Sequence, residues 1–167
     1  MPISTLEITN VRNLQRAQLE CSLESNLIIG PNGSGKTSLL ESIVILSQGK
    51  SFRNSQKKSI IFEGNSNLTI SALIENELNK QSIQGIRVGI SKFSNGKTLA
   101  KIAGEKVPRI SEITSVLPVC VIEPNSTEIV EGSPSLRRQV WDWGMFHVEP
   151  DFVKHWRVFS TALKQRN

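Results

Sequence analysis

The sequence predicts an α/β fold, and three stretches of the chain support this assignment. Residues 27–49 read in order as a buried strand, a glycine-rich loop and a helix. Residues 66–107 are short runs of alternating apolar and polar residues, the pattern of antiparallel strands with one buried face. From residue 108 the chain reads as helices and one further buried run. A chain of 167 residues is about one domain long and can build a core.

The first stretch, residues 1–62, opens with strand-like alternation at 6–8 and again at 19–23. It continues into Leu27-Ile28-Ile29, a continuous apolar run typical of a strand buried on both faces. Apolar residues then recur at helical spacing over 39–46, and Gly49 stands where a helix end is expected. The glycine-rich loop lies between the strand and the helix, as a phosphate-binding loop requires.

That loop fits the motif G-x-x-x-x-G-K-[ST] at every constrained position and reads Gly30-Pro31-Asn32-Gly33-Ser34-Gly35-Lys36-Thr37. Its glycines allow positive φ, so successive backbone N–H groups can converge on the phosphates at a helix N-terminus. We expect Lys36 to reach the β- and γ-phosphates and Thr37 to offer its hydroxyl to Mg²⁺. The predicted ligands are ATP and Mg²⁺, and the predicted nucleotide site extends to Ser38.

The second stretch, residues 66–107, is predicted to form an antiparallel β lobe inserted after the loop helix. Asn95-Gly96 indicates a hairpin with a two-residue turn, because both residues tolerate positive φ. The third stretch, residues 108–167, holds a short helix-like piece and the apolar run 119–122, which reads as buried. Two helices follow, one opening at Ser133-Pro134 and one running from about Pro150 to the end.

Composition permits several functions and excludes few. The formal net charge of +5 suits a polyanionic partner, but many proteins that never meet DNA share it. Cys21 and Cys120 lie far apart, without metal-ligand or redox spacing. No apolar stretch approaches the length of about 18 residues that spans a bilayer, and the N-terminus lacks a secretory pattern. We therefore expect a cytoplasmic protein.

An acidic residue at the end of a second buried strand is a further requirement of a P-loop enzyme. Glu123 is the candidate, since it follows the apolar run 119–122. With Glu123 as catalytic acid, the chain would be a self-contained small P-loop phosphotransferase or NTPase. The alternative is a carboxylate on the surface at a strand end. Pro124 stands where a second acid would be expected, and no guanine-reading N-K-x-D is present.

Several further motifs resemble the RecF family of bacterial recombination mediators, and they follow the family's order along the whole chain. The segments are Ile8-Thr9-Asn10-Val11-Arg12-Asn13-Leu14, Thr37-Ser38-Leu39-Leu40-Glu41-Ser42-Ile43, Gly49-Lys50-Ser51-Phe52-Arg53, Glu131-Gly132-Ser133-Pro134-Ser135-Leu136-Arg137-Arg138, Trp141-Asp142-Trp143-Gly144, Phe146-His147-Val148-Glu149-Pro150 and Leu163-Lys164-Gln165-Arg166-Asn167. Several motifs at matching spacing are more specific than the loop alone.

The resemblance implies the N-terminal part of an ABC-type ATPase head of the SMC class, in which a dimer sandwiches ATP and clamps DNA. It also implies a role at gapped or single-stranded DNA in replication, recombinational repair and the SOS response, with RecO and RecR as partners. Such proteins are about twice as long and are weak DNA-dependent ATPases. Their Walker B acid and signature motif lie in the second half, and neither occurs in this sequence. We expect this chain to be monomeric and inactive in hydrolysis.

The resemblance also assigns roles to basic residues. Arg12 matches a turn residue that approaches the bound phosphates, which suits a bidentate guanidinium; a solvated turn arginine is the alternative. A cluster that follows the loop helix is a candidate for contacting the DNA backbone or the nucleotide, unless it is a solvated loop: Lys50, Arg53, Lys57 and Lys58. Arg137 and Arg138 are candidates for DNA contact or for structural pairing.

Two further expectations concern the C-terminal stretch. After Pro124 the family commonly has an acidic residue or glutamine followed by Asp, whereas this chain has Asn125 and Ser126. A metal or water contact therefore does not carry over directly, although the amide oxygen of Asn125 retains the ability to coordinate. Trp141, Trp143 and Trp156 resemble stacking platforms for bases, but we expect most of them to pack in the core.

Overall fold

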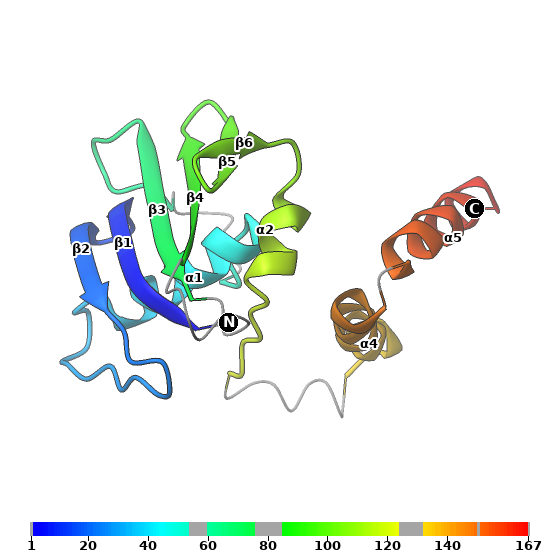
Figure 1. Ribbon diagram of the computed structural model, residues 1–167, viewed down its shortest axis with the longest axis horizontal. Coiled ribbons are helices and arrows are strands. Elements are labelled where there is room, and N and C mark those ends of the chain that lie inside the picture. Colours follow the sequence, from blue (N-terminus) through cyan, green and yellow to red (C-terminus); the bar gives the residue numbers. More distant parts are fainter. Residues whose placement is uncertain (1, 54–59, 76–84, 124–131, 150, 167) are drawn as a thin grey trace. The chain divides into compact units, whose positions relative to one another are not determined.

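The computed structural model describes residues 2–53, 60–75, 85–123, 132–149 and 151–166. The chain divides into two compact units, residues 1–119 and residues 120–167 (Figure 1). Among the described residues, the first unit holds the sheet, the helices α1 and α2 and the glycine-rich loop, and the second unit holds the helices α4 and α5.

A six-stranded antiparallel sheet forms the frame of the first unit, in the order β2-β1-β3-β4-β5-β6 (Figure 1). Its strands are β1 Ile3–Val11, β2 Leu14–Glu20, β3 Asn67–Ile74, β4 Ile86–Phe93, β5 Thr98–Ile102 and β6 Glu105–Val107. The antiparallel strands predicted within residues 66–107 are therefore present, because β3 to β6 all fall in that range. They continue the sheet begun by β1 and β2, since β3 pairs directly with β1.

The hairpin between β4 and β5 forms at Asn95-Gly96 as predicted, but its turn is longer. Only Gly96 of the pair takes positive φ, at +84°. The Gly96 N–H donates to Phe93 O at 3.0 Å, and the Phe93 N–H donates to Lys97 O at 2.9 Å. This is the three-residue arrangement with glycine in the left-handed position, so the predicted two-residue turn is wrong. A two-residue turn occurs instead at Ala103-Gly104, where both φ angles are positive.

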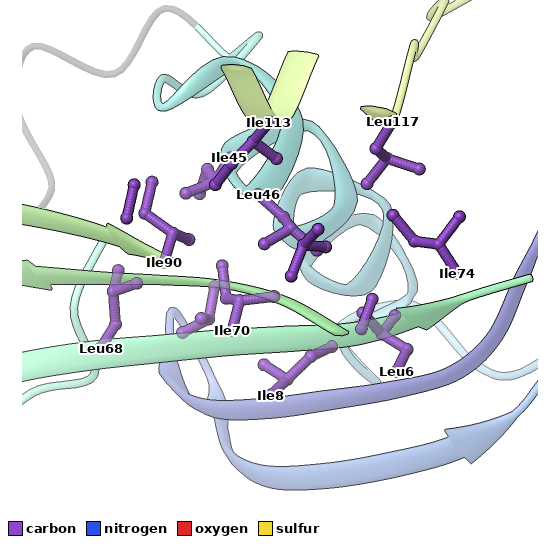
Figure 2. Packing of buried hydrophobic residues seen from close by; sticks show 14 residues of the cluster. Leu6, Ile8, Ile45, Leu46, Leu68, Ile70, Ile74, Ile90, Ile113 and Leu117 are labelled. Carbon is purple, nitrogen blue, oxygen red and sulfur yellow. The ribbon is translucent and has the colours of Figure 1, made fainter. Parts of the chain in front are cut away.

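The core lies between one face of the sheet and the helices α1 Lys36–Gln48 and α2 Ile110–Val116 (Figure 2). Every second residue of a strand points into this core, as the alternating burial of β3 shows. Leu6 and Ile8 from β1, Leu68 and Ile70 from β3, and Ile90 from β4 meet Ile45 and Leu46 of α1. The sheet and α1 thus share one core, while a hydrogen bond between Ser38 and Asn13 joins the start of α1 to the β1–β2 turn.

Two apolar runs that the sequence predicts to be buried strands are not strands in the structure. Leu27 and Ile29 are 85% and 84% exposed, and Ile122 is 88% exposed. No strand is assigned to 25–30 or 118–123 among the described residues. A continuous apolar run becomes a buried strand only where a neighbour pairs with its backbone and layers cover both faces. The described part of the chain supplies no such neighbour for either run.

The described part of the second unit contains the helices α4 Pro134–Val148 and α5 Phe152–Arg166. α4 begins at the predicted position, with Ser133 as N-cap and Pro134 in the first turn. The expected packing of the tryptophans in a core is wrong: Trp141, Trp143 and Trp156 are 74%, 38% and 45% exposed. Neither helix contains a buried residue, because these two helices alone enclose no core. Among the described residues, no helix is long and apolar enough to cross a bilayer.

Candidate functional site

The glycine-rich loop is shaped by backbone angles that favour glycine. Gly33 and Gly35 take φ of +84° and +96°, in the left-handed region where a side chain is strained. A Cβ added to Gly35 would also lie 2.6 Å from Leu14 Cδ2, so the Leu14 side chain would have to shift to admit one. Gly35 is the N-cap residue of α1, and no side chain caps the helix there. The first N–H groups of α1 are thus available to an anion, as in phosphate sites at helix N-termini.

Lys36 folds back over the loop. Its Nζ donates to Gly30 O at 2.7 Å and to Pro31 O at 2.8 Å. These contacts hold the ammonium above the loop and use two of its three donors. The loop itself therefore fixes the position of the lysine side chain.

Asn13, in the turn between β1 and β2, connects the loop with α1. Its Nδ2 donates to Gly33 O at 2.8 Å, and its Oδ1 accepts from the Ser38 hydroxyl at 2.7 Å. Both ends of the amide are in use, so the side chain has one defined orientation. The β1–β2 turn thereby supports the middle of the loop and the first turn of α1 together.

Arg12 precedes Asn13 in the same turn and has φ of +54°, which is uncommon for a residue with a side chain. Its backbone N–H donates to Ile60 O at 2.9 Å. Its guanidinium makes a two-point contact with Glu41 of α1, Nη2 to Oε1 at 2.7 Å and Nε to Oε2 at 3.1 Å. The Arg12 side chain is 12% exposed and that of Glu41 is fully buried.

Glu41 is also bonded from the segment that follows α1. The Ser51 hydroxyl donates to Oε1 at 2.5 Å, and Arg53 Nη1 lies 3.8 Å from Oε2. Burial alone would raise the pKa of the Glu41 carboxyl. The hydrogen bonds from Arg12 and Ser51 and the charges of Arg12 and Arg53 outweigh burial and hold this pKa below its usual range. Glu41 is therefore a buried carboxylate between two arginines.

A pocket of about 810 Å³ opens over the loop, and we call it the phosphate pocket. Its walls come from the β1–β2 turn, the loop, the start of α1 and the segment after α1: Arg12, Asn13, Asn32, Gly33, Gly35, Lys36, Thr37, Ser38, Arg53, Ile61 and Glu63. Most of the predicted nucleotide site, with Arg12, thus lines one cavity. Thr37 is exposed there, whereas the hydroxyl of Ser38 is committed to Asn13.

Residues 2–128 match the family model described as the RecF/RecN/SMC N terminal domain. The chain belongs to this family.

Relatives within the family cover the whole of this chain. The DNA replication and repair protein RecF of Marinomonas sp. (strain MWYL1) is 42% identical over 167 residues, which are 100% of this chain and 44% of that protein. A solved structure of the recombination mediator protein RecF with ATP matches 99% of this chain and 43% of its own, with 25% identity and a TM-score of 0.82. The chain therefore spans less than half the length of these relatives.

The wider fold of the family appears in a further solved structure. A chain from a study of ATP-driven dimerization and DNA-stimulated activation of SMC ATPases matches 86% of this chain and 99% of its own. The TM-score is 0.68 at 20% identity, which shows likeness of fold. The α/β P-loop head predicted from the sequence is thus the fold of this RecF/RecN/SMC chain.

The other predicted residues are distributed as follows. Arg53 lines the phosphate pocket, and Lys50 is exposed just after the C-terminal end of α1. Arg137 and Arg138 are exposed on α4 in the second unit. Lys57, Lys58, Asn125 and Ser126 lie outside the described residues. Within the described residues, no group of three His, Cys, Asp or Glu could hold a metal ion.

Glu123 lacks the structural context that a catalytic acid requires. The run before it was expected to be a buried strand, but Glu123 and Ile122 are both exposed and no strand is assigned there. A water-positioning carboxylate needs a fixed backbone at a strand end. The structure does not support the alternative of a self-contained enzyme that uses Glu123.

Sequence reasoning missed Glu41, Asn13 and Ser51 as parts of the site. A signal for Glu41 was present, since helical spacing places it on the same face as Ile45, one turn on, among core residues. A charged residue on a core-facing stripe requires a partner. No comparable signal marked Asn13 or Ser51, because their bonds join segments far apart in the sequence.

Proposed function

We propose that the phosphate pocket binds the triphosphate of ATP. The supporting observation is the convergence of three elements on one cavity: the left-handed glycines, the uncapped N-terminus of α1 and the ammonium of Lys36. Each of these recognises an anion by a different means, through backbone N–H groups, the helix dipole and a full charge. The name of the RecF–ATP structure supports ATP as the nucleotide.

Mg²⁺ suits the residues of this pocket when a triphosphate is bound. The exposed Thr37 hydroxyl is the protein ligand that we propose for it. Mg²⁺ prefers hard oxygen ligands and commonly keeps several waters beside one or two protein oxygens and the phosphates. The ion would supply neutralisation of phosphate charge there. The chain's own contribution is to hold Thr37 in the first turn of α1, next to Lys36.

We further propose that this chain contributes the nucleotide-binding part of a RecF-like DNA replication and repair protein. The names of its relatives support that role, and so does the family match. In this proposal ATP closes a homodimer around gapped or single-stranded DNA, and RecO and RecR are partners. The proposed DNA contacts are Lys50, Arg53, Lys57, Lys58, Arg137 and Arg138. A cytoplasmic location stays a prediction.

Replacing Lys36 by Ala tests nucleotide binding. The substitution removes a charge-assisted contact worth about 1.5 to 3 kcal/mol, so ATP affinity should fall roughly ten- to a hundredfold. Calorimetry with Mg²⁺ and a non-hydrolysable ATP analogue measures this. The same substitution at Lys97, which is exposed in the β4–β5 turn, is the matched control. Equal affinity in wild type and a folded Lys36→Ala protein would refute the assignment.

A further inference from the structure

We infer that Glu41 is a positioning residue for the triphosphate. It fixes the Arg12 guanidinium at the wall of the phosphate pocket. It holds the Arg53 guanidinium only by a weak ion pair, which a bound polyphosphate can replace. The inference rests on the proposed nucleotide site and adds to it. Glu41 does not line the pocket itself, and it acts through the two arginines that do.

Arg12 is fixed at both its backbone and its side chain. The backbone is fixed by the bond from its N–H to Ile60 O in a turn with left-handed φ. The guanidinium is fixed by the two-point contact with the buried Glu41. A strained residue persists where its surroundings over-determine it, and such positions concentrate at ligand sites. Arg12 therefore presents one defined surface to the pocket before a ligand arrives.

Arg53 is held in a different way. Its backbone is tied to Glu41 through Ser51, whose hydroxyl accepts the Arg53 N–H at 2.9 Å and donates to Glu41 Oε1 at 2.5 Å. Its guanidinium, however, is half exposed and stands 3.8 Å from Glu41 Oε2, beyond hydrogen-bond length. An ion pair at that distance and exposure is weak, so a polyphosphate in the pocket can take the Arg53 side chain over from Glu41.

Charge and position predict opposite results when Glu41 is made neutral. If Glu41 only reduces the positive charge of the pocket, removing its charge strengthens attraction for a triphosphate. If Glu41 positions the arginines, an amide in its place offers one acceptor oxygen where the carboxylate offers two, and Arg12 loses its two-point contact. The sign of the change in affinity therefore separates the two roles.

The experiment is calorimetry with Mg²⁺ and a non-hydrolysable ATP analogue on wild type, Glu41→Gln and Glu63→Gln. Glu63 is the matched control, because it lines the same pocket but, within the described part of the chain, its side chain holds neither arginine. We expect Glu41→Gln to bind about tenfold more weakly, and Glu63→Gln to bind about twofold more tightly. Tighter binding by Glu41→Gln, or equal weakening by Glu63→Gln, would overturn the inference.

Two milder variants keep the test valid if Glu41→Gln does not fold. Ser51→Ala removes one bond to Glu41 and should weaken triphosphate binding about threefold. Arg53→Gln should weaken binding of the triphosphate more than binding of AMP. A single phosphate has less negative charge and fewer acceptor oxygens with which to draw the Arg53 guanidinium away from Glu41. Unchanged triphosphate affinity in both folded variants would also overturn the inference. If wild type does not bind, or binds independently of Lys36, the proposed function itself has failed.

Discussion

At the scale of single residues, one amide holds much of the site together. Asn13 bonds a loop carbonyl with one end and an α1 hydroxyl with the other. Neither contact can be read from local sequence, because 20 and 25 positions separate the partners. The motif spacing predicted the glycine-rich turn and the helix after it, because both are determined locally. The hydrogen bonds that hold this turn in place come from Asn13, which is distant in the sequence, so the local sequence pattern does not reveal them.

Replacing Asn13 by Ala should weaken both the fold and the site. Each lost hydrogen bond contributes about 0.5 to 1.5 kcal/mol, so Tm should fall by several degrees and ATP affinity about three- to tenfold. Asn26 also uses both ends of its amide, on Ser22, and gives a matched control. Asn26→Ala should lower Tm without the loss of affinity, as thermal melting and calorimetry would show. Equal loss of affinity in both variants would contradict a specific role for Asn13.

At the scale of elements, the two ends of α1 serve different purposes. Its N-terminus faces the phosphate pocket, while its C-terminal end is closed by a cation from the sheet. Lys92 of β4 donates from Nζ to Gly49 O at 2.7 Å, and Gly49 caps the helix with φ of +70°. A cation suits the negative end of a helix. Burial nevertheless lowers the pKa of Lys92, because removing the ammonium from water disfavours its charged form.

This gives a stability prediction with a definite sign. Because the pKa of Lys92 is lower in the folded protein, the unfolded chain binds more protons between the folded and unfolded values. The Lys92 contribution to the free energy of unfolding should therefore rise as pH increases toward about 10.4, the ordinary lysine value. Lys92→Met should lack this rise, as urea denaturation from pH 7 to pH 10 would show. Lys97→Met controls for the lost charge. If the free energy of unfolding depends on pH in the same way in wild type and in Lys92→Met, the lowered pKa of Lys92 is refuted.

The elements whose type is determined by residues next to each other in the sequence were predicted correctly. The alternation in β3 and β4 and the Pro134 start of α4 are of this kind. The runs 27–29 and 119–122 were misassigned because apolar character alone says that a segment favours burial, not which segment covers it. The pairing partner is a property of the fold, and the described residues do not contain one.

At the scale of the whole molecule, we expect the chain to lack the signature motif that would face the phosphate pocket in an ATP-bound dimer of the SMC class. We expect the 167-residue chain to give the same mass by light scattering with and without Mg²⁺ and an ATP analogue. Closure of such a dimer needs donors from the opposite subunit on the γ-phosphate, and an isologous contact requires the same patch on both copies. A nucleotide-dependent dimer that Lys36→Ala abolishes would show that this half carries its own closing interface.

The exposed segment before the loop has a practical consequence for handling the protein. Leu27 and Ile29 present apolar side chains to water from a segment that has no assigned strand partner within the described residues. Such a segment is a template for strand addition between molecules, and edges that carry charges or bend away avoid it. Purified material should therefore lose solubility as its concentration rises, whether or not nucleotide is present. Lysine at Leu27 would act as a gatekeeper and extend the usable concentration range.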